Sequence, residues 1–198
     1  MDRFCLNGKW KLYFNDEKGV MPKNMAEVKK MGWPCIESYV PGNVELDLYR
    51  AGIEQDPFYS QNIYNFRKYE FYQWWYEREF EIPGHFKGKN IILKLNGLDD
   101  FGTIWINGVL CGSVGNMFIE HEIDITSAVR IGEVNHIAIR IESAINKVRS
   151  REFPINIIGG ENIDEMVWLR KPPHSFGWDI APRFISAGLW RDVEILAR

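Results

Sequence analysis

Alternation of hydrophobic and polar residues, the pattern of a strand with one buried face, recurs along most of the chain. The clearest example is residues 137–141, where three isoleucines are separated by Ala138 and Arg140. Since one parity is apolar and the other mostly polar, the pattern predicts antiparallel sheets with one wet face. Comparable alternation is found in segments 9–14, 76–82, 91–95, 104–106 and 192–195.

Segment 76–82 departs from the simple pattern at one position. Arg78 falls on the apolar parity, where a charged side chain is unexpected. The opposite parity holds three glutamates, which we expect to form a solvated strand face. These are Glu77, Glu79 and Glu81.

Turn and helix signals fall between the predicted strands. Asn107-Gly108 follows segment 104–106 and predicts a tight hairpin. Helical patterns are short: residues 43–51, with Asn43 as N-cap, and the segments 21–32 and 124–129. Strands joined by a few short helices predict an all-β fold, a β-sandwich or jelly roll.

Two long segments, residues 52–74 and 143–182, lack strand alternation and are rich in aromatic and polar side chains. Long loops without a function are uncommon in compact domains. We therefore expect both segments to be ordered and to form one edge of the sandwich. Within the first, we expect Asp56, Tyr59 and Asn62 to serve turn formation.

Composition narrows the classes of partner. The chain has 198 residues, which predicts a single domain over 1–198, and its net charge of −3 gives no signal for nucleic acid. No apolar run is long enough to span a membrane, and we expect no signal peptide at the N-terminus. The 3 cysteines and 4 histidines lack metal-ligand spacing, so neither a metal nor a cofactor is expected.

The segment 174–184, HSFGWDIAPRF, is the strongest candidate for chemistry. It places Trp178 directly beside Asp179, with Arg183 nearby. An indole face packs against the C–H groups of a sugar, and a carboxylate accepts hydrogen bonds from its hydroxyls. A packed corner with one satisfied carboxylate is the alternative interpretation of the same residues.

A series of motifs in a fixed order extends over nearly the whole chain. It resembles the N-terminal sugar-binding domain of family-two glycoside hydrolases, in the β-mannosidase-like branch. The motifs are LNGKW (6–10), VPGNVELDLYRAGI (40–53), DPFYSQN (56–62), QWWYEREF (73–80), LNGLDDFGTIWINGVLCG (95–112), NMFIEHEIDIT (116–126), RKPPHSFGWDIAPR (170–183) and GLWRDVEI (188–195).

The resemblance implies a galactose-binding-domain-like jelly roll that forms the first domain of an exo-acting retaining β-glycosidase. It also implies that an immunoglobulin-like domain and a catalytic barrel, which are absent from this chain, follow. Retaining glycosidases use two carboxyl groups about 5–5.5 Å apart. The Asn-Glu dipeptide that carries the acid/base in this family is absent from the chain. We therefore expect no catalytic residue and no hydrolysis by the isolated chain.

The resemblance also assigns substrate contact to Trp178 and Asp179, which line the subsite of a terminal β-linked sugar, possibly mannose. Arg183 either holds Asp179 or pairs elsewhere, and Arg170 and Lys171 are candidates for the border of the pocket. Where the family usually has tryptophan and glutamate, this chain has Ile180 and Ile63. A related exo-glycosidase with another sugar preference therefore stays open.

Two other functions fit the same residues. A free-standing carbohydrate-binding module uses such a sandwich with an aromatic platform at its loop edge. A protein-interaction domain presents the same aromatic loops to a protein partner. The fold alone does not decide among the three functions.

Overall fold

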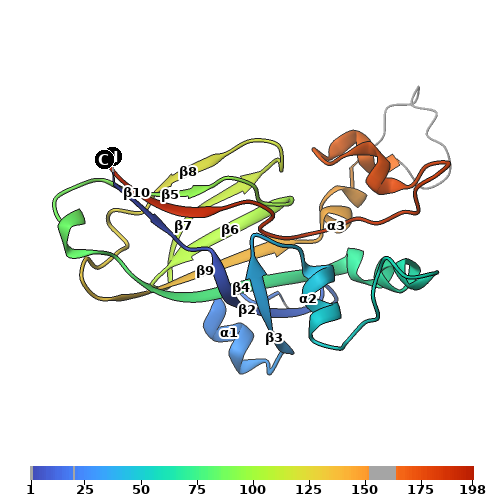
Figure 1. Ribbon diagram of the computed structural model, residues 1–198, viewed down its shortest axis with the longest axis horizontal. Helices are drawn as coiled ribbons and strands as arrows, with labels where there is room; N and C mark the ends of the chain where they lie inside the picture. The colour runs from blue at the N-terminus through green and yellow to red at the C-terminus, as the bar shows by residue number, and fades with distance from the viewer. Residues whose placement is uncertain (1, 20, 152–163) are drawn as a thin grey trace.

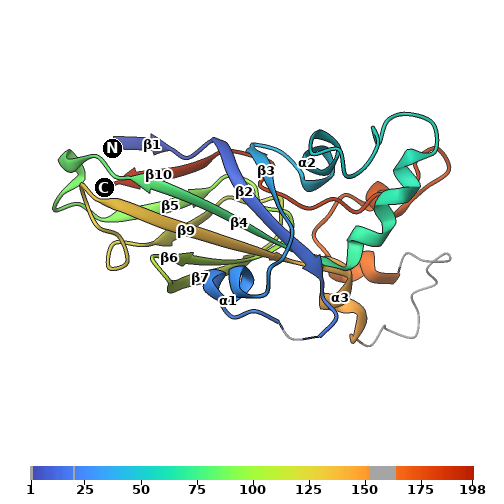
Figure 2. The ribbon, with the colours of Figure 1, turned by 90° about the horizontal axis from the view of Figure 1, so that it is seen from below.

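The structure is a computed structural model that describes residues 2–19, 21–151 and 164–198. In this part of the chain, two sheets with antiparallel strand pairs stack face to face, as Figures 1 and 2 show. One sheet has the strand order β1 (Asp2–Cys5), β10 (Val193–Ala197), β5 (Ile91–Leu95) and β8 (His121–Asp124). The other has the order β3 (Cys35–Val40), β2 (Gly8–Asp16), β4 (Tyr72–Glu81), β9 (Val134–Glu142), β6 (Phe101–Ile106) and β7 (Val109–Gly115). The predicted all-β jelly-roll sandwich is confirmed.

The core fills the space between the sheets with the apolar parity of the predicted strands. Leu12 of β2, Trp74 of β4 and Ile139 of β9 come from the larger sheet. Leu93 of β5 and Ile195 of β10, which lie opposite each other in register, come from the smaller one. All five side chains are at most 1% exposed. Burial of these alternate residues is the main force that holds the sheets together.

Arg78 has a structural explanation. Its side chain follows the inward parity of β4, and one guanidinium nitrogen, Nη1, donates to the carbonyl oxygens of Leu6 and Asn7 at 2.6 and 2.7 Å. These two residues connect β1 to β2, so the arginine satisfies backbone acceptors where the strands separate. The anomaly in the pattern therefore marks a link between the two sheets.

The outward parity of β4 is not fully solvated. Helix α1 (Met25–Lys30) covers part of this face, and Val28 packs with Trp75 in a separate apolar cluster. Glu77 is only 7% exposed, and Lys29 donates to its carboxylate at 2.5 Å. The expectation of a wet glutamate face is wrong at Glu77, because alternation along a strand cannot show which helix later covers it.

Helix α2 (Val44–Arg50) also lies close to where the sequence predicts a helix. It starts after Asn43, whose side chain accepts a hydrogen bond from the amide of Leu46 at 3.0 Å. Such capping satisfies an amide that has no partner within the helix. Segment 124–129 forms a single turn.

The remaining helical segments, except η2 (Gly84–Phe86), gather at the right-hand end of the sandwich in Figures 1 and 2. We call this end, with α2, the loop end. The hydroxyl of Ser143 donates there to the carbonyl oxygen of Glu70 at 2.5 Å, which joins a residue of each segment. For their described residues, the two long unpatterned segments thus meet at one edge, as expected. The segments concerned are η1 (Asn62–Phe71), α3 (Ala144–Arg149), η3 (Asp164–Trp168) and η4 (Pro173–Phe176).

Candidate functional site

Trp178 and Asp179 lie on a tight turn at the loop end. The amide of Trp178 donates to the carbonyl oxygen of Ala181 at 2.8 Å, and the reverse bond measures 3.1 Å, so Asp179 and Ile180 form the tip. Gly177 precedes the turn with a φ of 100°, which disfavours any side chain. Trp178 is 70% exposed, Ile180 is 88% exposed, and Asp179 is also exposed. An indole and a carboxylate therefore both face solvent from one hairpin, which we call the Trp178 hairpin.

Arg183 lies at the base of the Trp178 hairpin and pairs with Glu70 of η1. Its Nε is 3.1 and 3.0 Å from the two carboxylate oxygens, and its Nη2 is 2.9 Å from one of them. A second carboxylate, that of Glu165, is 3.8 Å from Nη1, and the ring of Phe176 lies 5.6 Å from the guanidinium. The arginine therefore connects the hairpin to η1 and η3, and the pairing elsewhere that the sequence left open is observed.

Lys171 is buried and does not border a pocket. Its ammonium contacts the carboxylate of Asp99 and donates to the carbonyl oxygen of Ser186 at 2.7 Å. With 5% of the residue exposed, it is sealed from any ligand, which corrects the expectation from sequence. Arg170, the neighbouring candidate, is exposed.

Buried acids form a layer below the loop end that sequence reasoning missed. Glu45 of α2 accepts a hydrogen bond from the hydroxyl of Ser186 at 2.7 Å, and burial raises the pKa of Glu45 to about 8. Burial also raises the pKa of Asp100 to about 6, although Lys171 opposes the shift. Because both residues are at most 3% exposed, these acids lie inside the domain, beneath the loops. The adjacent acids Asp99 and Asp100, which follow a predicted strand, were the signal in the sequence that could have revealed this layer.

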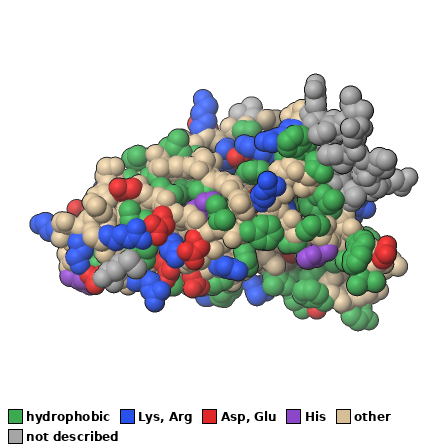
Figure 3. Space-filling model, turned by 90° about the horizontal axis from the view of Figure 1, so that it is seen from above, with side chains coloured by type: hydrophobic (Ala, Val, Ile, Leu, Met, Phe, Trp, Pro, Cys, Tyr) green, Lys and Arg blue, Asp and Glu red, His purple; other side chains and the backbone are tan. Residues whose placement is uncertain are grey.

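A second group of exposed aromatic side chains belongs to η1 and to the loop that leads into it. Phe58, Tyr59 and Tyr64 are 82%, 72% and 54% exposed. Asp56 starts this loop and accepts a hydrogen bond from the amide of Phe58 at 2.9 Å, which confirms its turn role. Figure 3 shows hydrophobic side chains at the surface of the loop end, whereas charged side chains gather toward the opposite end.

The described ranges contain no group of three or more His, Cys, Asp or Glu side chains arranged to hold a metal ion. No helix in the same ranges is long and apolar enough to cross a bilayer.

Comparison with known proteins identifies the family. The profile of the glycosyl hydrolase 2 galactose-binding domain-like family matches residues 12–191. The chain belongs to this family. It is 32% identical over 171 residues to the β-mannosidase of Rattus norvegicus, covering 80% of this chain and 19% of that protein. It is 28% identical over 204 residues to the β-mannosidase of Capra hircus, covering 97% of this chain and 21% of the relative. The glycosyl hydrolase 2 domain described here thus spans about a fifth of the length of these relatives.

Solved structures agree with this assignment. The β-D-mannosidase of Dictyoglomus thermophilum superposes with a TM-score of 0.81 at 30% identity, covering 100% of this chain and 23% of that one. The β-glucuronidase of Ruminococcus gnavus superposes with a TM-score of 0.60 at 24% identity, covering 99% and 29% of the two chains. The second likeness shows the fold alone. The family match and the likeness to β-mannosidases confirm the resemblance to the N-terminal domain of β-mannosidase-like enzymes.

Proposed function

We propose that this domain forms one wall of the terminal sugar subsite in an exo-acting retaining β-glycosidase of the β-mannosidase type. The reactive carboxyl groups then belong to a catalytic domain elsewhere in the same polypeptide, and residues 1–198 constitute the N-terminal accessory domain. A terminal β-linked sugar, with mannose as the first candidate, is the ligand. This division of labour agrees with the length of the relatives, which extend well beyond the matched region.

The Trp178 hairpin is the observation that supports this function. Its indole and carboxylate are exposed at the tip, while Arg183 and Glu70 fix the base of the hairpin through a buried bidentate pair. We propose that Trp178 packs on the sugar ring and that Asp179 accepts hydrogen bonds from its hydroxyls. Arg183 serves the same site by holding the hairpin in place. Phe58, Tyr59 and Tyr64 provide apolar surface on which a neighbouring domain can pack.

Substitution of Asp179 in the full-length gene product tests the proposal. Loss of a charge-assisted hydrogen bond weakens binding by about 1.5–3 kcal/mol, so D179A should lower kcat/KM for an aryl β-mannoside about 10–100-fold. Glu79→Ala is the matched control, because Glu79 is an exposed acid on the outer sheet face, and it should leave kcat/KM unchanged. Unchanged kinetics for D179A, with the fold intact, would exclude substrate contact by this residue.

The isolated chain provides a second test. It should release no aryl alcohol from the same substrate, because one wall of a shared site lacks the pair of reacting carboxyl groups. Micromolar affinity of the isolated chain for mannosides at the Trp178 hairpin would instead favour an independent carbohydrate-binding module. One wall alone should bind a sugar only weakly.

A further inference from the structure

A polar groove lies on the outer face of the six-stranded sheet, away from the Trp178 hairpin. Its volume is about 410 Å³, and residues of β6, β7, β9 and α3 line it. The register explains how it forms: Thr103 of β6 lies between Ser113 of β7 and Arg140 of β9, and in the next row Phe101 lies beside Glu142. Small-molecule sites typically occupy about 300–1,000 Å³, so the groove has the size of a ligand site.

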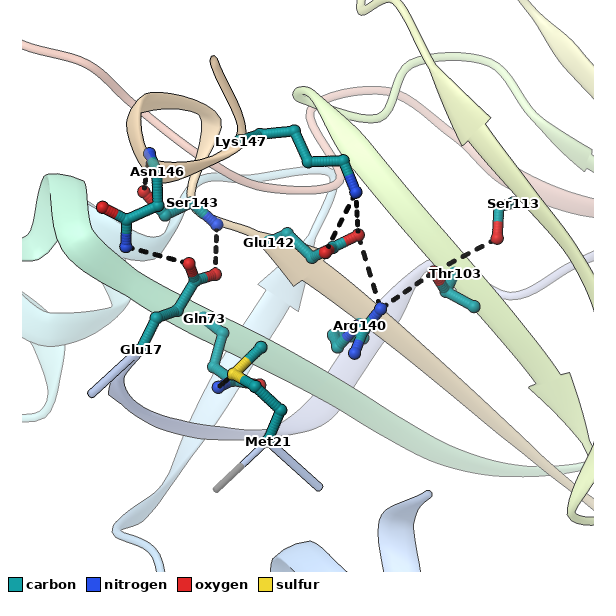
Figure 4. Close-up of polar contacts among 10 residues, drawn as sticks. All are labelled: Glu17, Met21, Gln73, Thr103, Ser113, Arg140, Glu142, Ser143, Asn146 and Lys147. Carbon is teal, nitrogen blue, oxygen red and sulfur yellow. Dashed lines mark hydrogen bonds and ion pairs between the residues drawn. The ribbon is translucent and has the colours of Figure 1, made fainter. Parts of the chain in front are cut away.

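A continuous series of polar contacts crosses this groove, as Figure 4 shows. The Lys147 ammonium lies 3.2 Å from the Glu142 carboxylate, which is 3.4 Å from Nη2 of Arg140. The same Nη2 is 3.5 Å from the hydroxyl of Thr103, to which the Ser113 hydroxyl donates at 3.2 Å. Charge-assisted hydrogen bonds are usually 2.7–2.9 Å long, so the contacts of Arg140 are loose.

Two aromatic rings help to hold Arg140 in position. Its guanidinium lies 5.8 and 5.9 Å from the rings of Trp75 and Trp105, which stack on each other 5.0 Å apart. Nε is buried without a hydrogen-bond partner in the described part of the chain, and of the five N–H donors of the guanidinium those on Nη2 make only the long contacts given above. The arginine is therefore fixed in place while its donors are only partly used.

The mixture of groups indicates the chemical class of the ligand. A simple anion would face the carboxylate of Glu142, and a simple cation would face Arg140 and Lys147. Neighbouring hydroxyls of a sugar both donate and accept, so they match a row of cation, carboxylate and hydroxyl groups. The half-buried ring of Phe101 lines the same groove, with the Lys147 ammonium 5.9 Å from its centroid, and its exposed part offers an apolar surface for sugar C–H groups.

We propose that this groove is a second saccharide site, which binds a ring of a neutral oligosaccharide independently of the Trp178 hairpin. A non-catalytic site of this kind would keep a polymeric or branched glycan close to the domain. It does not depend on the sugar that the hairpin contacts, nor on the presence of a catalytic domain.

Amide chemical shifts of the ¹⁵N-labelled 198-residue chain, titrated with mannotriose and cellotriose, test this proposal. At least one of the two sugars should produce saturable shifts at Thr103, Ser113 and Glu142. Glu142→Gln removes the charged acceptor and should weaken this binding about tenfold or more. Ser113→Arg should abolish it by filling the groove. Glu79→Gln, on the same outer face, is the matched control and should not change the affinity.

The following results would contradict the proposal of a second saccharide site. Absence of saturable shifts in the groove excludes it, as do shifts confined to the loop end. An equal response to sodium acetate would show a general anion site, and shifts that depend on protein concentration without sugar would show contact between copies of the chain. If Ser113→Arg does not fold, the Glu142→Gln titration decides. D179A should leave groove binding unchanged, so failure at the hairpin and failure at the groove are distinguishable.

Discussion

Replacement of Arg183 by methionine tests whether buried charge fixes the loop end. The side chains of Arg183 and Glu70 are only 11% and 5% exposed, and their three N–O contacts measure 2.9, 3.0 and 3.1 Å. Methionine removes the guanidinium but leaves the Glu70 carboxylate in a buried position. Loss of one partner of a buried pair destabilises a protein by about 3–5 kcal/mol, and we expect this decrease for R183M.

The double variant Glu70→Leu/Arg183→Met separates pairing from packing. It removes both charges and places apolar groups at the same positions, which often leaves stability unchanged or improves it. We therefore expect the double variant to recover most of the loss seen for R183M. The coupling energy from the complete cycle should reach about 2–3 kcal/mol.

Urea unfolding followed by tryptophan fluorescence measures all four proteins. Lys9→Met is the matched control: Lys9 is 3.0 Å from Glu37, but the two side chains are 66% and 52% exposed. Water screens such a pair, so the control should show no measurable change. If R183M is as stable as the unaltered chain, or if the two single effects simply add, the buried pair does not fix the loop end.

Two further substitutions test the buried acids below the Trp178 hairpin and the glycine that precedes this hairpin. Because burial raises the pKa of Glu45 from 4.5 to about 8, the folded state binds the extra proton and stability falls as pH rises through that interval. The free energy of unfolding of Glu45→Gln should therefore exceed that of the unaltered chain by an amount that grows with pH, from none near pH 4.5 to about 4 kcal/mol at pH 8. A difference between the two proteins that does not change with pH would refute this. Gly177→Ala places a side chain at a φ of 100° and should lower the free energy of unfolding by about 1–3 kcal/mol, with a lower thermal midpoint. Gly84→Ala is the control, because the space around Gly84 is open, and it should change the thermal midpoint little. Equal effects of the two substitutions would contradict backbone strain at position 177.

Local patterns predicted the scaffold well. The isoleucines of β9 alternate into the core, and the hairpin at Asn107-Gly108 has positive φ at both residues, 51° and 80°. These features depend on neighbours in sequence, through the pleat of a strand or the twist of a turn. Strands β1, β3 and β8 were not predicted, because their sequences show little alternation of apolar and polar residues.

Long-range pairing was beyond the reach of the sequence. Glu70 and Arg183 are 113 residues apart, and Asp99 and Lys171 are 72 apart. No periodicity connects such positions, so the burial of Lys171 was missed and Arg183 was left with two possible partners. The position of the exposed Trp178–Asp179 pair was easier to predict, because a turn rich in glycine and proline places its tip at the surface.

The chemistry of the loop end explains why charge, and not only apolar contact, holds it. Burial of an ion pair adds little net stability, because desolvation offsets the attraction, but it penalises every arrangement that separates the partners. A bidentate contact such as Arg183–Glu70 also fixes orientation, which a cluster of apolar side chains constrains less. The Lys171–Asp99 pair ties the same segment to the end of the sheets. The Trp178 hairpin thus depends for its position on pairs whose loss would change where it points even if the sandwich remained folded.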